Sequence, residues 1–157
     1  MAVIEIDPYE ALILLARADG ELLTQVGERI DIWHHYGQDT GDWELDDKSI
    51  IFIPSGGELD HDNSIAHPVF EVRCYARTPY ECGQVWRSLV GFTNVSTENN
   101  NRRNAIVTEG TALIYFVLPV EGAGMPRLLF DEDIKPNGGL PYYSGQFKAQ
   151  ISTVTVT

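Results

Sequence analysis

The chain has 157 residues, of which 43% are hydrophobic and 22% are charged, and its formal net charge is −12. This length and composition fit one globular domain with a core of its own, and they exclude a disordered chain and a disulfide-stapled miniprotein. The acidity disfavours tight binding to phosphate backbones or anionic membranes, because such binding draws on lysine and arginine.

The N-terminal segment predicts a helix with a clear start signal. Asp7 is a good N-cap, Pro8 suits the first turn, and the apolar residues of 8–18 recur at helical spacing. Gly20 interrupts the pattern, and a short second helical turn is expected to end at Gly27. Because the N-terminus is acidic rather than basic, we expect no secretion signal and a reducing, cytosolic site of folding.

The next part of the chain predicts short strands between polar segments. "RIDIW" alternates like a strand, and "SIIFI" reads as a strand over Ser49–Ile53 that Pro54 and the following glycines stop. We expect polar loops at about 34–47 and 54–67.

The segment from Val69 to Phe92, "VFEVRCYARTPYECGQVWRSLVGF", carries the clearest pattern in the chain. Its first half alternates with period two, which predicts a strand with one buried and one polar face. Thr78, Pro79 and Glu81 form a capping-box pattern that opens a helix with one apolar stripe. The predicted core of this unit is Phe70, Val72, Cys74, Cys82, Val85, Trp86 and Leu89.

The remainder predicts β-structure after a long polar loop at about 93–104. "TALIYFVL", over Thr111–Leu118, is apolar throughout and is expected to be a strand covered on both faces. A strand begins at "RLLF", and a long final strand changes its apolar phase after Ser152, which indicates a bulge or a change of partner. We expect this uncharged tail to be paired, and a neighbouring subunit is one candidate partner. The whole chain, 1–157, is expected to be one α+β domain, a mainly antiparallel mixed sheet with two helices packed on one face.

The residues do not form a recognisable catalytic motif. Cys74 and Cys82 are eight positions apart and are interpreted mainly as core residues, with a functional thiol pair as the alternative. His61 and His67 lie near two aspartates, but their spacing matches no common metal motif, and Ser64 has no nucleophile elbow around it. We therefore expect a protein that is not an enzyme and needs no metal or cofactor.

The segment Val69–Phe92, together with the N-terminal "ALILLARADGELLTQVGERI", resembles the tail-terminator (tail-completion) proteins of long-tailed bacteriophages. The resemblance covers roughly Tyr9 to Phe92, and its motifs are architectural. It implies a small subunit that forms a homo-oligomeric ring, a hexamer in that family, on the head-proximal end of the tail tube. Such a ring ends tube polymerisation and offers a surface for joining the head. The implied location is the virion tail or neck, after assembly in the host cytoplasm.

The resemblance also implies a set of partners: other copies of the chain, the tail tube protein, and head–tail connector or neck proteins. DNA would pass through the lumen without specific binding. Candidate subunit-interface residues lie on the polar strand face, with Arg73 and Arg77 facing acids of the adjacent subunit: Glu71, Arg73, Tyr75 and Arg77. Candidate contacts with the tube or neck lie in the polar loops: Asp60, His61, Asp62, Asn99, Arg102 and Arg103.

Two alternatives remain open at this point. Another neck component, such as a head–tail connector or a head-closure protein, would share size, acidity and ring symmetry. A small metal- or ligand-binding enzyme using the region of His61 and His67 is the alternative from a different class.

Overall fold

The computed structural model describes residues 3–5, 7–32, 47–60, 65–97, 103–107, 110–120, 125–135, 137–152 and 154–156. Within these residues the chain forms three helices and nine strands. Their order is β1 (Val3–Glu5), α1 (Pro8–Ala18), α2 (Gly20–Val26), β2 (Ile30–Ile32), β3 (Ser49–Asp60), β4 (Ile65–Tyr75), α3 (Pro79–Thr97), β5 (Arg103–Val107), β6 (Gly110–Pro119), β7 (Arg127–Asp131), β8 (Leu140–Ser152) and β9 (Val154–Val156). The predicted α+β class is confirmed.

One main sheet organises the molecule, with the strand order β2-β3-β4-β8-β6-β5. β2 runs parallel to β3, and the other pairs are antiparallel. β8 is the central strand: β4 pairs along one side of it, while β7 and β6 share the other side, β7 along its first half and β6 along its second.

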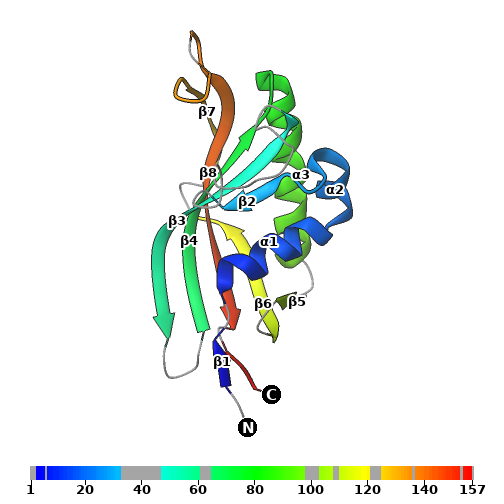
Figure 1. Ribbon diagram of the computed structural model, residues 1–157, viewed down its shortest axis with the longest axis vertical. Coiled ribbons are helices and arrows are strands. Elements are labelled where there is room, and N and C mark those ends of the chain that lie inside the picture. Colours follow the sequence, from blue (N-terminus) through cyan, green and yellow to red (C-terminus); the bar gives the residue numbers. More distant parts are fainter. Residues whose placement is uncertain are drawn as a thin grey trace.

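All three helices lie on the same side of this sheet (Figure 1). Asp7 caps α1 by accepting a hydrogen bond from the Tyr9 amide, as predicted. Asp19 ends α1 and also caps α2, and Gly27 ends α2 with a φ of 60°, a left-handed value that favours glycine. The predicted helical turn is thus a helix of its own, and three helices rather than two cover the sheet.

The α3 unit follows the sequence prediction closely at its start. The Thr78 hydroxyl accepts a hydrogen bond from the Glu81 amide at 3.3 Å, which is the N-cap bond. Trp86 lies directly on Gly145 of β8, where a Cβ atom would clash with the indole ring. Every predicted core residue of this unit is buried.

Aromatic rings fill the space between the helices and the sheet. The Phe70 ring packs edge-on against Phe52, with centroids 5.5 Å apart, and stacks on Phe147 at 6.3 Å. The Tyr9 ring of α1 packs edge-on against Phe70 and completes this group. A smaller apolar cluster lies on the opposite face of the sheet and contains Ile51, Tyr75, Leu140 and Tyr142.

The predicted stop at Pro54 is wrong. The expected polar loop at 54–67 is strand over 54–60 and 65–67, and 61–64 lies outside the described residues. β3 runs on to Asp60 and pairs with the start of β4, across an irregularity between Pro54 and Gly57. Gly57 has a φ of 120° and approaches the His67 carbonyl so closely that a side chain would clash. Glycine therefore lets the hairpin continue instead of ending it.

Two further expectations need correction, and a third is confirmed in part. α3 extends through Thr97 and β5 begins at Arg103, so the polar segment 93–104 is helix and strand at its two ends, and 98–102 lies outside the described residues. β6 buries one side only, through Ala112, Ile114 and Val117, because none of the described helices packs on the other side. The C-terminal strand does change partner, but β9 pairs with β1 of the same chain.

Candidate functional site

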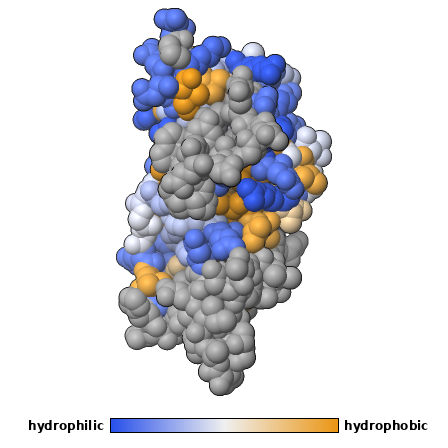
Figure 2. Space-filling model, in the orientation of Figure 1, coloured by the Kyte–Doolittle hydropathy of each residue, from blue (hydrophilic) through white to orange (hydrophobic). Residues whose placement is uncertain are grey.

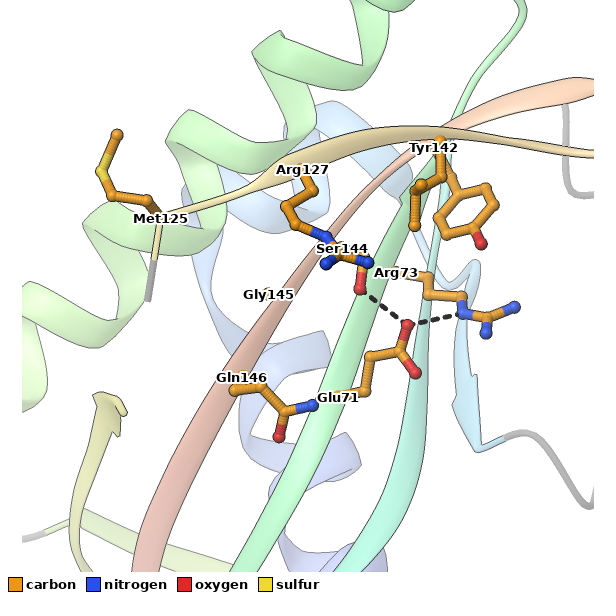
Figure 3. A pocket seen from close by; sticks show the side chains of 9 residues that line it. Glu71, Arg73, Met125, Arg127, Tyr142, Ser144, Gly145 and Gln146 are labelled. Carbon is orange, nitrogen blue, oxygen red and sulfur yellow. Dashed lines mark hydrogen bonds and ion pairs between the residues drawn. The ribbon is translucent and has the colours of Figure 1, made fainter. Parts of the chain in front are cut away.

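The open face of the sheet, opposite the helices, holds a hollow of about 490 Å³ (Figure 3). It lies where β4, β7 and β8 meet, and it is lined by charged, polar and apolar side chains. The lining residues are Glu71, Arg73, Met125, Arg127, Leu129, Tyr142, Ser144, Gly145 and Gln146. The hollow is therefore the place where the predicted polar face of β4 meets two later strands.

A hydrogen-bond network starts at the carboxylate of Glu71. This carboxylate accepts from Arg73 Nε at 2.8 Å and from the Ser144 hydroxyl at 2.6 Å, both drawn in Figure 3. The Arg73 guanidinium also lies 4.8 Å from the centroid of the Tyr142 ring, within the range of a cation–π contact. Glu71 and Arg73 thus tie β4 to β8 across the open face.

The network continues from Arg73 toward β7. Arg73 Nη1 donates to the Tyr75 hydroxyl at 3.2 Å, and that hydroxyl donates to Asp131 at 3.3 Å. Burial raises the pKa of Tyr75 well above its ordinary value, and the hydrogen bond from Arg73 offsets this only in part. The phenol therefore stays protonated and donates to the carboxylate. The charged groups of this network pair with one another within the chain. The network therefore holds three strands in place and does not present an unpaired carboxylate as a general base.

The four predicted subunit-interface residues have different surroundings. Glu71 and Arg73 face the hollow, whereas Tyr75 is fully buried beneath it and cannot meet a partner protein directly. Arg77 follows the end of β4 and pairs with Asp47 at 3.5 Å, with both side chains exposed. Both arginines thus have acidic partners in their own chain, which differs from the expectation that they face acids of a neighbour.

The predicted contact loops are only partly described. Asp60 is the last residue of β3, half-buried at the hairpin end, and Arg103 is the first residue of β5. His61, Asp62, Asn99 and Arg102 lie outside the described residues.

The two thiols are part of the scaffold. Cys74 of β4 and Cys82 of α3 are both buried and both free, and the Cys82 thiol donates to the Pro141 carbonyl at 3.2 Å. Burial raises the pKa of both thiols, that of Cys82 to about 11. Protonated, buried thiols are poor nucleophiles. Both cysteines are thus buried, as the sequence predicted.

A second hollow, of about 400 Å³, lies between α1 and β2. Arg17 lines it and donates from Nη2 to the Ile30 carbonyl at 2.7 Å, while its Nε is buried without a hydrogen-bond partner among the described residues. Asp7, Glu10 and Asp31 also line the hollow. Burial, with the nearby Asp7 charge, raises the pKa of Tyr9 to about 12. The bonds from Arg17 to Ile30 and from Tyr9 to Val69 join α1 to the sheet.

Sequence reasoning missed the exposed apolar side chains on two projecting parts of the sheet. We call residues 54–60 with 65–68 the β3–β4 arm, and residues 125–135 with 137–144 the β7–β8 arm. Leu59 of the first arm is 43% exposed, and the second carries Met125, Leu128 and Phe130, which are 83%, 42% and 53% exposed. Figure 2 shows apolar surface over the far end of β3 and over β7. The sequence signal that could have found them is the alternation of side chains in "RLLF", Arg127–Phe130, compared with that of the final strand.

No protein-family model and no curated protein matches the chain. No described helix has both the length and the apolar character needed to cross a membrane. Within the described ranges, His, Cys, Asp and Glu side chains do not gather in threes as a metal ion would need.

Proposed function

We propose that the protein is a structural virion subunit that forms a ring on the head-proximal end of a phage tail tube. The ring ends tube polymerisation and offers the surface to which the head is joined. Support comes from the resemblance of Tyr9–Phe92 to tail-terminator proteins and from the confirmed α+β architecture that this resemblance implies.

The observation that carries the proposal is the placement of the exposed apolar side chains. The β3–β4 arm and the β7–β8 arm lie at opposite ends of the molecule (Figure 1). The register agrees, because β8 pairs Tyr142 with Tyr75 at one end of β4 and Ser152 with Ile65 at the other. A ring needs two different, complementary surfaces on each subunit, whereas a two-fold dimer needs only one self-complementary patch. Two separate apolar arms fit the first requirement.

The charge of the chain suits a channel for DNA. A net charge of −12 on each copy repels phosphate, so DNA slides through a ring of such subunits without being held. The purified protein should therefore not bind a labelled DNA duplex at low salt. Binding with a steep salt dependence would contradict this part of the proposal.

The proposal is tested by electron microscopy of the purified protein mixed with purified tail tubes. We expect a ring at one end of each tube, and we expect tubes grown in the presence of the protein to stay short. A connector or head-closure protein would not stop growth at the free end of a tube. Tubes that grow equally long with and without the protein, and carry no end ring, would overturn the proposal.

A further inference from the structure

Several strand edges of the main sheet lack a neighbouring strand among the residues that the structure describes, and two of these edges carry exposed leucines. β7 pairs with β8 on one side only. β2 covers β3 only along Ile50–Phe52, so the outer edge of β3 from Ile53 to Asp60 has no paired strand in the described ranges. These edges belong to opposite sides of the sheet, because β7 shares its side of β8 with β6. A strand edge with apolar side chains is a template for pairing with another chain.

The two edges carry matching side-chain patterns. Paired residues of adjacent strands point to the same side of a sheet. Leu59 pairs with Ala66 and so points to the helix side, where Phe70 and Val72 of β4 also point. Leu128 pairs with Tyr143, which contacts α3 at Gly83, and so points to the helix side as well.

The alternate positions carry opposite charges. Glu58 pairs with His67 and points to the open face. Arg127 pairs with Ser144, the hydroxyl that donates to Glu71 on the open face, and borders the hollow there (Figure 3). Each edge thus has an exposed leucine on the helix side and a charged residue on the open side, acidic on β3 and basic on β7.

The geometry points to a contact between copies in which the β7 edge of one subunit pairs with the 57–60 edge of β3 in the next. This inference rests on the proposed ring and names the surfaces that close it. The sheet continues across the boundary, a recurring way for chains to recognise one another. Leu59 lies against Leu128 on the helix side, and an acid lies beside Arg127 on the open face.

The topology fixes the direction of pairing. The pairs β3–β4, β4–β8 and β7–β8 are each antiparallel, so β7 runs antiparallel to β3 within the chain. Because the two edges lie on opposite sides of the sheet, copies whose helix sides face the same way meet with antiparallel strands. With Leu59 opposite Leu128, Asp60 then lies opposite Arg127, and a carboxylate meets the guanidinium on the open face. The tube protein, as another occupant of either edge, gives a different result in the experiment below.

The test uses three matched variants, Leu59→Asp, Leu128→Asp and Leu23→Asp. Leu23 is 50% exposed on α2, away from both edges, and serves as the control. Self-association of the purified full chain is measured by sedimentation velocity over a wide concentration range, and folding by circular dichroism. We expect Leu59→Asp and Leu128→Asp to weaken self-association at least about a hundredfold while Leu23→Asp matches the wild type, since each arm variant buries a carboxylate in an apolar contact.

Mixing the two arm variants gives the decisive result. A Leu59→Asp subunit keeps an intact β7 edge, and a Leu128→Asp subunit keeps an intact β3 edge. An equimolar mixture should therefore form heterodimers that cannot grow further, although each variant alone is monomeric. A mixture that stays monomeric, arm variants that assemble like the wild type, or a wild type that is monomeric at every concentration would each overturn the inference.

Charge reversal tests the ion pair on the open face. Arg127→Glu should weaken assembly, and Asp60→Arg should rescue it, whereas Glu58→Arg, two positions away on the same strand, should rescue it less. Failure of Asp60→Arg to rescue excludes Arg127 from the contact and overturns the charge pairing. The tube-capping experiment remains independent: a ring that caps tubes but assembles normally with both arm variants would refute this contact and leave the proposed function standing.

Discussion

The two faces of the main sheet are built from the same strands but are stabilised differently. On the helix side, Phe70, Val72 and Cys74 are buried among apolar groups from three helices. On the open side, the alternate residues Glu71, Arg73 and Tyr75 are held by hydrogen bonds to β7 and β8. The period-two pattern of β4 thus separates two sides, but the polar side is largely occupied by the chain itself. On the described part of this side, the rim of the hollow and the two arms are open to a partner.

The largest expected effect tests the helix side. Phe70→Ala should lower the free energy of unfolding by about 3–5 kcal/mol, because the deleted ring contacts Tyr9, Phe52 and Phe147 and leaves a cavity. Urea denaturation followed by circular dichroism measures the loss. A loss below about 1 kcal/mol would mean that the helix layer does not depend on this aromatic group.

The matching change on the open side is Arg73→Ala. It removes two hydrogen bonds and leaves Glu71 and Asp131 near one another without their cation, so we expect a loss of about 1–3 kcal/mol. Arg77→Ala is the control, because its exposed pair with Asp47 should contribute less than about 1 kcal/mol. If both arginine variants lost the same free energy of unfolding in this experiment, the network would be no more stabilising than an exposed surface ion pair.

The buried thiols should make stability fall at high pH. The folded chain holds the Cys82 proton more tightly than the unfolded chain, since burial raises its pKa from 9.0 to about 11. The resulting stabilisation is complete below pH 9 and is lost as the pH rises toward 11, by about 1–2 kcal/mol. Cys82→Ala should flatten this slope in unfolding curves taken at pH 8 and pH 10.5. An unchanged slope would locate the pH dependence in other groups.

The smallest effect concerns the bond between β8 and β4 on the open face. Ser144→Ala removes one donor from Glu71, which keeps Arg73, so the expected loss is about 0.5–1.5 kcal/mol. Ser55→Ala, at an exposed position on the β3–β4 arm, should change stability less. Thermal unfolding of both variants provides the comparison, and a larger effect at Ser55 would argue against the network.

Local sequence signals predicted the helix side well because they depend on near neighbours. The cap at Asp7, the cap at Thr78 and the apolar stripe that ends at Leu89 are local signals. Each is formed by residues that lie within a few positions of one another in the sequence. The same signals failed at Pro54, where proline and glycine residues indicated a stop. Their meaning there depends on the carbonyl of His67 across the hairpin.

The open face was less predictable because its partners come from distant parts of the chain. The Tyr75 hydroxyl meets Asp131, 56 residues later, and Glu71 meets Ser144, 73 residues later. Alternation showed that Glu71, Arg73 and Tyr75 share one side, but not that later strands would cover Tyr75. The proposed contact edges could not be predicted from the sequence for a similar reason. The side of the sheet to which Leu59 and Leu128 point depends on the strand register.

The central position of β8 has a consequence for synthesis on the ribosome. β4, β6 and β7 all depend on β8 as a neighbour, yet residues 140–152 are translated after the three of them. The nascent chain therefore carries unclosed strands until this segment has left the exit tunnel, and closure requires pairing between residues as far apart as Ile65 and Ser152. Chaperones that shield such strands should bind the growing chain during this interval and release it once β8 is in place.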